Sequence, residues 1–228
     1  MLRTTRLGEA DRIVNLVTEN RGKVRAVVKG VRRTASRWGG RMEPLMHVSL
    51  MAWNGRELDT VTQAEVVEVF KCVREDLNRM AKAAVMAEVV DRLCHDQSDD
   101  PAPYRMLRGA LASLDSADSP AIVGAFLWKL LAQEGAAPVL EICAGCGGEG
   151  PLRYFDPAAG GATCGSCRGG RPLSPGAADA IAGVLGGRLN SVLRECDSRT
   201  ASEMERLAAA AMEHHLERRL WSLGVLER

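Results

Sequence analysis

The stretch GKVRAVVKG, residues 22–30, decides how the beginning of the chain folds. Its side chains alternate in character, as they do on the two faces of a β-strand. One face would be apolar, with Val24, Ala26 and Val28. The other would be largely basic, with Arg25, Val27 and Lys29. The pattern predicts a half-buried strand that presents cations to solvent.

Further strand candidates lie on both sides of this stretch. Residues 13–18 form a mostly apolar run with β-branched ends, and the ENRGK segment that follows supplies turn residues. Downstream, residues 46–53 lead through Asn54-Gly55, a strong hairpin signal, into residues 58–69. With the few residues before Leu7, four to five strands emerge and no helix of useful length separates them. This arrangement favours a small closed barrel over a doubly wound sheet.

Positive charge gathers in the same region. Residues 27–41, VVKGVRRTASRWGGR, hold five Lys and Arg and no acid. The first 41 residues hold eleven cations against three acids, a local balance of +8 in a chain whose net charge is only +1. Residues 81–228 compensate, with 15 Lys and Arg against 19 Asp and Glu. Such a concentrated charge suits a polyanionic partner.

From about residue 72 the apolar period becomes helical. The predicted apolar stripe consists of Val73, Leu77, Met80, Ala84, Val85, Val89 and Leu93. After a break at DQSDDPAP, Ser119-Pro120 and Ser174-Pro175 each combine a good N-cap with the residue favoured at the first helical position. A last long helix is expected over residues 200–223, with Ser202 and Glu205 in capping-box spacing.

Four cysteines interrupt this helical half. Cys143, Cys146, Cys164 and Cys167 are spaced C-x2-C-x17-C-x2-C. Two such pairs can place four sulfurs at tetrahedral corners, which predicts a closed structural Zn²⁺ site with no open position for catalysis. The same sulfurs could instead hold rubredoxin-like iron, act as a redox dithiol, or form disulfides. Cys72, Cys94 and Cys196 are interpreted as small buried hydrophobes.

Catalytic signatures are weak. Glu9 and Asp11 stand beside Arg12 without a His or nucleophile, so a structural loop or salt link is the better interpretation. His214 and His215 are adjacent on a predicted helix, where side chains point about 100° apart and do not easily share an ion. There is no phosphate-loop motif, no secretory signal and no membrane-length apolar run. A non-enzymatic protein of the reducing cytoplasm is expected.

Taken in order, these features resemble the RecO family of bacterial recombination mediators. The resemblance rests on Leu7-Gly8-Glu9-Ala10-Asp11-Arg12, the strand and loop over residues 22–33, and the two C-x2-C pairs. It implies an α+β multidomain protein: an N-terminal OB-type β-barrel at residues 1–71, and an all-α helical domain at residues 72–228 with a zinc ribbon inserted at 143–171. It also implies binding of single- and double-stranded DNA, strand annealing, and cooperation with RecR to help RecA replace single-strand-binding protein, all without enzymatic turnover.

An OB barrel binds nucleic acid on a strand face and its flanking loops, where cations follow phosphates and aromatic rings stack on bases. The expected DNA-binding residues are Arg25, Lys29, Arg32, Arg33, Arg37, Trp38 and Arg41. Two alternatives stay open: Trp38 could be tucked into the barrel, and the basic surface could serve a protein adaptor that contacts an acidic partner. Family members usually carry a longer N-terminal segment, so either the first strand is truncated here or its start lies further upstream.

Overall fold

The computed structural model describes residues 1–96 and 98–222, which form two compact units. The first unit comprises Met1–Ser116, and the second begins at Ala117. Helices begin near residue 71, but the first unit continues to Ser116. Three helices therefore belong to the same unit as the N-terminal strands. None of the helices in the described ranges is long and apolar enough to cross a bilayer.

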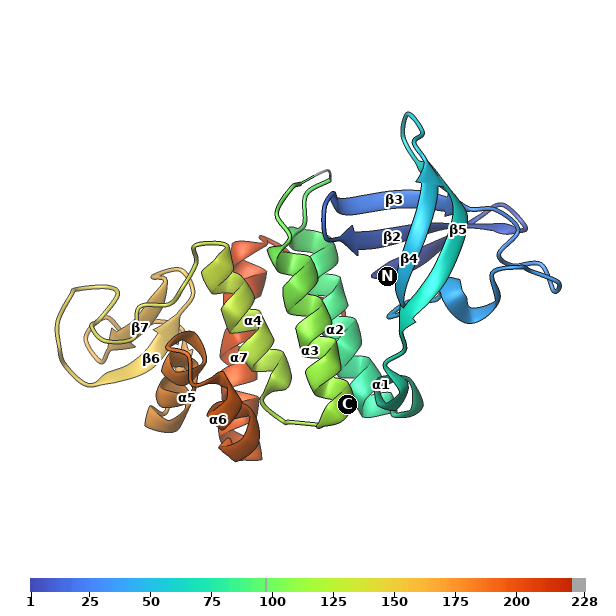
Figure 1. The fold of residues 1–228 in the computed structure, drawn as a ribbon. Helices are drawn as coiled ribbons and strands as arrows, with labels where there is room; N and C mark the ends of the chain where they lie inside the picture. Colours follow the sequence, from blue (N-terminus) through green and yellow to red (C-terminus); the bar gives the residue numbers. More distant parts are fainter. Residues whose placement is uncertain (97, 223–228) are drawn as a thin grey trace. The chain divides into compact units, whose positions relative to one another are not determined.

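The first unit contains one five-stranded sheet (Figure 1). Its strands are β1 (Arg3–Leu7), β2 (Asp11–Thr18), β3 (Gly22–Val28), β4 (His47–Trp53) and β5 (Asp59–Glu68). They lie in the order β1-β2-β3-β5-β4, antiparallel throughout except for the parallel pair β3 and β5. All the predicted strands are confirmed.

The two edges of this sheet approach each other at one point. Ahead of β1, the Met1 nitrogen donates to Met46 O at 2.7 Å, and Leu45 N donates to Met1 O at 3.0 Å. Leu45 and Met46 directly precede β4. These two bonds join the starts of the two edge strands, β1 and β4.

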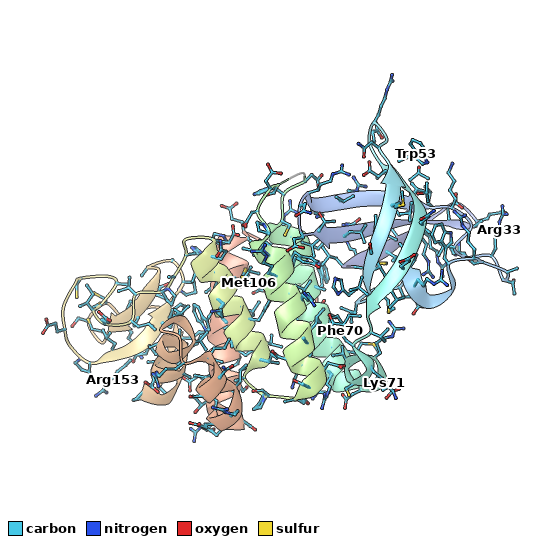
Figure 2. The ribbon with its side chains drawn as sticks, viewed as in Figure 1. Arg33, Trp53, Phe70, Lys71, Met106 and Arg153 are labelled. Atoms are coloured by element: carbon cyan, nitrogen blue, oxygen red, sulfur yellow. The ribbon has the colours of Figure 1, made fainter. Side chains whose placement is uncertain are left out.

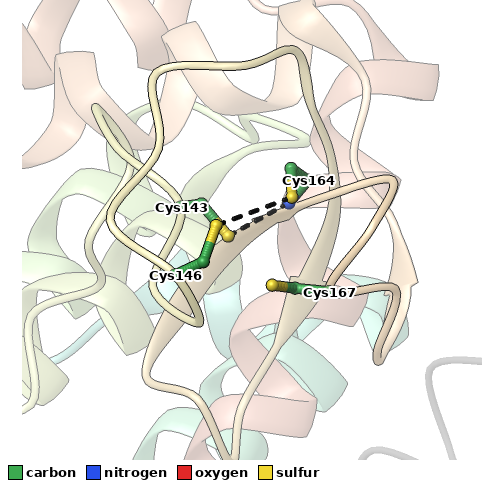
Figure 3. Close-up of side chains that lie close together, drawn as sticks. All are labelled: Cys143, Cys146, Cys164 and Cys167. Carbon is green, nitrogen blue, oxygen red and sulfur yellow. Dashed lines mark hydrogen bonds between the residues drawn. The ribbon is translucent and has the colours of Figure 1, made fainter.

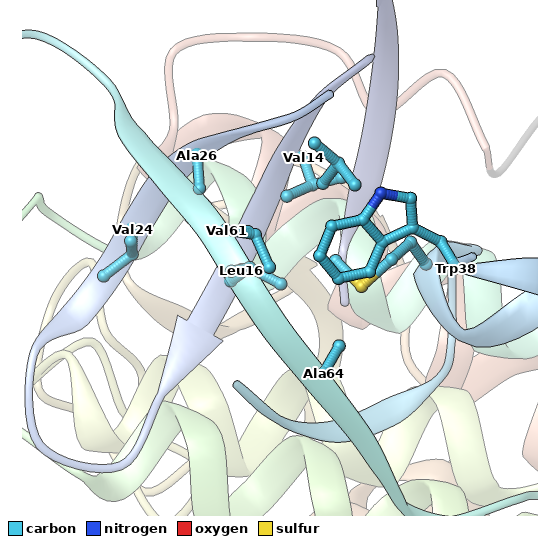
Figure 4. Packing of buried hydrophobic residues seen from close by; sticks show 9 residues of the cluster. Val14, Leu16, Val24, Ala26, Trp38, Val61 and Ala64 are labelled. Atoms are coloured by element: carbon cyan, nitrogen blue, oxygen red, sulfur yellow. The ribbon is translucent and has the colours of Figure 1, made fainter. Parts of the chain in front are cut away.

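The concave side of the sheet is packed with apolar side chains (Figure 4). The strands contribute Val14, Leu16, Val24, Ala26, Val28, Val61 and Ala64. The predicted apolar face of residues 22–30 is thus the one that is buried. Trp38 and Met42 enter the same cluster from the connection between β3 and β4, which includes a single 3-10 turn, η1 (Gly39–Met42).

Helices α1 (Lys71–Glu75), α2 (Leu77–Leu93) and α3 (Ala102–Ser116) complete the first unit. The predicted apolar stripe of α2 is partly wrong, since the side chains of Leu77 and Met80 are 83% and 37% exposed. The reason is that α2 is apolar around much of its circumference between Ala83 and Val90. The helix is buried along this segment, whereas its first turn stays exposed. Asp91 near its end accepts hydrogen bonds from Arg3 and Asn15 and pairs with Lys23, which fastens α2 to the sheet.

The second unit is built around α4 (Ile122–Gln133), which is buried on nearly all sides. It packs against α5 (Pro175–Leu185), α6 (Leu189–Glu195) and α7 (Ser198–His215). At Gly124 a Cβ would lie 3.0 Å from Glu205 N, so this glycine permits the close approach of α4 and α7. Between α4 and α5 the chain forms a small sheet, order β7-β6-β8, from β6 (Leu152–Asp156), β7 (Gly161–Cys164) and β8 (Arg171–Pro172).

The helix starts agree with the sequence at one place and differ at two others. Ser174 Oγ accepts from Ala177 N as the N-cap of α5. Ser119 Oγ accepts from Ala121 N, but α4 begins two residues later than expected, with Ala121 as its N-cap and no side-chain cap hydrogen bond. The predicted capping box at Ser202 is wrong. Asp197 caps α7 instead, accepting from Arg199 N at 2.9 Å and Thr200 N at 3.1 Å, so the helix begins earlier and ends at His215. The predicted end of that helix, residue 223, lies outside the described residues.

Candidate nucleic-acid interface and metal centre

The connection between β3 and β4, residues 29–46, is called the basic loop below. Its central residue Trp38 is 3% exposed and donates its indole N–H to Lys29 O at 2.8 Å. Met42, one turn further on, is fully buried in the same core. Two apolar side chains thus pin a long polar loop to the concave side of the sheet.

The base-stacking role expected for Trp38 is therefore wrong, because its ring is covered by the core. The alternative, that Trp38 is tucked into the sheet, is confirmed. The guanidinium of Arg37 lies over the ring, 4.4 Å from its centroid, and donates to Thr62 O at 3.2 Å. Trp38 thus holds Arg37 in place.

The beginning of the basic loop is fastened to the β1–β2 turn. Arg32 donates from its side chain to Gly8 O and Glu9 O, at 3.2 and 2.9 Å. Asp11 accepts from Gly30 N at 2.7 Å. The acidic pair near the N-terminus includes a structural carboxylate, as expected, and the LGEADR motif serves as an anchor for this loop.

Several cations from the N-terminal cluster are occupied by acids. Arg3 and Lys23 contact Asp91 at 2.6 and 3.0 Å, and Arg21 contacts Asp59 at 3.2 Å. Burial alone would raise the pKa of Asp91, but hydrogen bonds from Lys23 and Asn15, and the charge of Lys23, outweigh it and lower that pKa. These cations have their charge neutralised by acids of the fold, whereas the cations described next do not.

The remaining predicted DNA-binding cations stay accessible. Arg25, Lys29, Arg33 and Arg41 are exposed and have no acidic partner among the residues that the structure describes. Arg32 and Arg37 use their donors on backbone carbonyls, which leaves their charge unneutralised. Figure 2 shows the labelled Arg33 at the outer end of the basic loop, away from the sheet.

A groove lies where the basic loop meets β5. It has a volume of about 530 Å³ and is lined by Arg37, Trp38, Arg41 and residues 62–66. Arg37 and Arg41 give one wall positive charge, whereas Glu65 on β5 gives the other a single carboxylate. The groove can therefore receive an anionic chain along the basic loop.

Sequence reasoning missed Trp53, the last residue of β4. Its side chain is 75% exposed, in contrast to the buried Trp38. The position next to Asn54-Gly55 at a hairpin turn was a signal for exposure, but the burial of one Trp and the exposure of the other depend on strand register.

The four predicted metal ligands are brought together (Figure 3). The sulfurs of Cys143, Cys146, Cys164 and Cys167 all lie within 4.8 Å of one another. Sγ of Cys146 and Sγ of Cys164 are 3.9 Å apart. Around a tetrahedral Zn²⁺ with Zn–S of 2.3 Å, sulfurs are about 3.8 Å apart. The cluster therefore has the size of a four-thiolate metal site.

Backbone amides converge on these sulfurs. Cys164 N donates to Cys143 Sγ at 3.3 Å, and this bond, with further amides of Cys146 and Gly145, lowers the pKa of Cys143 to about 6. Hydrogen bonding with the sulfurs of Cys146 and Cys143 raises the pKa of Cys167 to about 12. The site therefore favours deprotonation of one cysteine but disfavours deprotonation of all four. A bound cation would be needed to keep all four as thiolates.

The ribbon that carries these cysteines packs on the helices of the second unit. Phe155 on β6 is buried and meets Trp128 of α4 edge to face, with 5.4 Å between ring centroids. Trp128 also donates its indole N–H to Met204 O in α7 at 3.2 Å. The ribbon is thereby joined to the helical core through one aromatic pair.

The other cysteines and histidines are less distinctive. Cys72 is exposed, so its expected burial is wrong, and Cys94 and Cys196 are only half-buried. His214 and His215 are exposed at the end of α7, as expected of surface histidines. No second cluster of metal-ligating side chains occurs in residues 1–96 and 98–222.

The comparisons with known proteins agree with this architecture. The family model described as Recombination protein O N terminal matches residues 1–70, and the one described as Recombination protein O C terminal matches residues 74–224. The DNA repair protein RecO of a Nocardioides species is 41% identical over 238 residues, covering 100% of this chain and 97% of the relative. The DNA repair protein RecO of Frankia casuarinae is 39% identical over 234 residues, covering 100% and 96%. The chain therefore belongs to the RecO family of DNA repair proteins.

Proposed function

We propose that this chain is a non-catalytic, DNA-binding recombination mediator whose first unit is an OB-type barrel. The observation that carries the proposal is the set of exposed cations with no acidic partner in the described residues, held by β3 and by the basic loop that Trp38 anchors. An anchored loop loses little conformational freedom when it binds, so its charges can be used fully for phosphate contacts.

The chemistry of these contacts favours binding to any sequence. Arg and Lys recognise phosphates through charge, which gives affinity without base readout. Both single- and double-stranded DNA present such phosphates, which is compatible with annealing of complementary strands. Membership of the RecO family supports RecR, RecA and single-strand-binding protein as partners in this process. It also supports the cytoplasm as the place where the protein acts.

We also infer that the four cysteines bind a structural Zn²⁺ ion. The ligand set is all sulfur, and four protein ligands leave no position for a reacting water, which supports a structural role and not a hydrolytic one. Iron bound by four thiolates is the competing occupant. Elemental analysis of the purified protein distinguishes the two metals.

The DNA-binding proposal is tested by anisotropy of labelled single-stranded DNA across a salt series. The variant Arg25→Ala, Lys29→Ala, Arg33→Ala, Arg41→Ala removes four cations that make no described ion pair. Its matched control, Lys129→Ala, Arg194→Ala, Arg206→Ala, Arg218→Ala, removes the same charge from exposed positions of the second unit. The loop variant should lose affinity, and its log–log salt slope should shrink by about two or more, at roughly 0.7 per phosphate.

Equal behaviour of the two variants would contradict the proposal. If both bind DNA as the unaltered chain does, the basic surface serves an acidic protein partner, and the adaptor hypothesis takes first place. If both weaken DNA binding to the same extent, the effect reflects net charge and not the basic loop. Thermal unfolding of each variant shows whether the fold is intact.

A further inference from the structure

Trp53 exposes a large aromatic ring that the fold does not use. It ends β4 with a side chain that is 75% exposed, and Met51 on the same strand is 61% exposed. Figure 2 shows Trp53 at the end of β4 beside the β4–β5 turn. An exposed tryptophan offers a large flat ring on which a planar ligand can stack.

The strand register places Trp53 on a defined face of the sheet. Trp53 lies opposite Thr60 on β5, and Thr60 lies opposite Val27 on β3. Val27 in turn lies opposite Ile13 on β2. Residues directly opposite each other share a face, so Trp53 belongs to the convex face, which turns away from the buried cluster. The burial pattern agrees. Ala26 and Val61, which stand next to Val27 and Thr60 in the sequence, point to the opposite, concave face and are buried there.

Two accessible cations lie beside that row. Arg25, two residues before Val27, is on the same face and exposed, and Lys29 follows the end of β3 and is exposed. Strands are spaced about 4.8 Å apart and residues about 3.4 Å along a strand. Trp53 is thus roughly 10 Å from Val27, two strands away, and Arg25 lies about 7 Å further along β3. These separations suit a ring and two cations that contact one short oligonucleotide.

Helix α2 covers the part of the convex face beside Asn15 and Lys23. Asn15, opposite Arg25, is 4% exposed because its side chain bonds Asp91 of α2. The same carboxylate holds Arg3 and Lys23. On β2 and β3, a ligand is therefore restricted to the end that carries Val27 and Arg25.

The hairpin that carries Trp53 is held in position. Arg21 from the β2–β3 turn donates to Asn54 Oδ1 at 3.3 Å and to Asp59 Oδ2 at 3.2 Å. Gly55 N donates to Asp59 Oδ1 at 3.2 Å, and a Cβ on Gly55 would lie 1.9 Å from Leu58 O, so the turn requires glycine. Trp53 is therefore presented by a braced turn and not by a free loop.

We propose that Trp53 is a stacking platform for an unpaired base of single-stranded nucleic acid, whose phosphates lie along Arg25 and Lys29. This inference rests on the proposed DNA binding and adds to it a reason to prefer single strands. In a duplex the bases are already stacked on one another and cannot reach the ring, whereas every unpaired base offers a π-face. Trp53 would add affinity that does not depend on salt.

The test compares Trp53→Ala, Trp53→Leu and Trp53→Phe in the full chain, with an oligo(dT) strand and a duplex of equal length. Removal of one base–ring stack is expected to weaken single-strand binding by about fivefold to a hundredfold. Leu should behave like Ala because it has no ring, and Phe should retain most of the affinity. The salt slope and the duplex affinity should change little.

Intrinsic fluorescence supplies a second readout with an internal control. Trp38 and Trp128 are buried, whereas Trp53 and Trp221 are exposed, at 75% and 83%. The strand should quench the fluorescence of the unaltered chain and of Trp221→Ala, and the quenching should be lost in Trp53→Phe and Trp53→Leu. Trp221→Ala should bind DNA normally.

The outcomes separate this inference from the function on which it rests. If the Trp53 variants bind oligo(dT) with unchanged affinity while the basic-loop variant does not, the stacking site is refuted and DNA binding stands. If the unaltered chain binds no DNA at any salt concentration, both ideas are refuted. A Trp53→Ala chain that weakens single and double strands equally also overturns the inference, because the ring would then not discriminate unpaired bases.

Discussion

Trp38 is the residue on which the geometry of the basic loop depends. It fills the concave core, bonds Lys29 O and supports Arg37 on its outer side. Trp38→Ala would leave a cavity and free one backbone carbonyl, and we expect it to lower the free energy of unfolding by about 3–5 kcal/mol. Urea denaturation measures this loss.

A milder change at the same residue tests its role in binding. Trp38→Phe keeps a ring in the core and removes the indole N–H, so the loop should remain in place with modestly reduced stability. Single-strand affinity per folded molecule should then stay close to that of the unaltered chain. A large loss of affinity with intact folding would mean that Trp38 itself contacts the nucleic acid.

The two tryptophans of the first unit show what single residues in a sequence can and cannot reveal. Trp38 and Trp53 both stand beside Gly and polar residues, and only the hairpin signal that follows Trp53 distinguishes them locally. Trp38 is buried because the basic loop folds back onto the core cluster of the sheet. Trp53 is exposed because its pairing with Thr60 places its side chain on the face opposite that cluster. Both causes are long-range, whereas the alternation of residues 22–28 is local and predicted the correct face.

Helix α2 is attached to the sheet through one buried carboxylate. Asp91→Asn keeps the shape of the side chain but leaves Lys23, whose side chain is 16% exposed, without its counter-charge. We expect a loss of about 2–4 kcal/mol in the free energy of unfolding, below the loss for a fully buried pair because the Arg3 side chain is 61% exposed. Chemical denaturation at neutral pH measures it.

The pH dependence of that loss has a definite sign. The pKa of Asp91 is lowered in the folded protein, so its contribution is complete above the unfolded-state pKa of about 3.9 and disappears as the pH falls through the folded value. The difference in unfolding free energy between Asp91→Asn and the unaltered chain should therefore be constant from pH 7 to about 5 and shrink below about 4. A difference that grew on acidification would contradict this assignment.

The ribbon is the element that we expect to depend on the proposed metal. A glycine-rich insert with little core of its own can be organised by a bound ion, for which apparent binding energies of about 10–16 kcal/mol are typical. Chelation of the metal, or Cys143→Ser, should release the ribbon, disturb the Phe155–Trp128 pair and change the near-UV circular dichroism. DNA affinity of the basic loop should persist, because the loop belongs to the other unit. Unchanged spectra after complete metal removal would show that the ribbon folds alone.

Elements were predictable from sequence wherever a local signal acts alone. The strands, the hairpin at Asn54-Gly55, the Ser174-Pro175 helix start and the cysteine pairs were each predicted from residues close together in the sequence. The failures occurred where two local signals compete. Asp197 caps α7 ahead of Ser202, and the apolar stripe of α2 was ambiguous because apolar residues surround the helix.

At the scale of the whole molecule, the change of period near residue 72 does not mark the end of the first folded unit. Helices α2 and α3 contact the sheet through polar pairs as well as apolar packing: Asn15 Nδ2 donates to Asp91 Oδ1 of α2 at 3.1 Å, and His47 Nε2 lies 2.9 Å from Tyr104 OH of α3. Family models meet near residue 72 as well, since they follow sequence similarity, whereas compactness extends to Ser116.

Two fragments of the chain distinguish these boundaries. Residues 1–116 should unfold cooperatively and bind single-stranded DNA with the salt slope of the full chain, because the Asp91 cluster and the basic loop are retained. Residues 1–71 should fail to fold, since a sheet of this size buries too little apolar surface alone and loses the cover of α2 and α3. Dispersion of amide proton resonances and thermal melting measure both results. If residues 1–71 folded with the stability of residues 1–116, the helices would be a separate domain that merely touches the sheet, and Asp91→Asn would then leave the stability of the sheet unchanged.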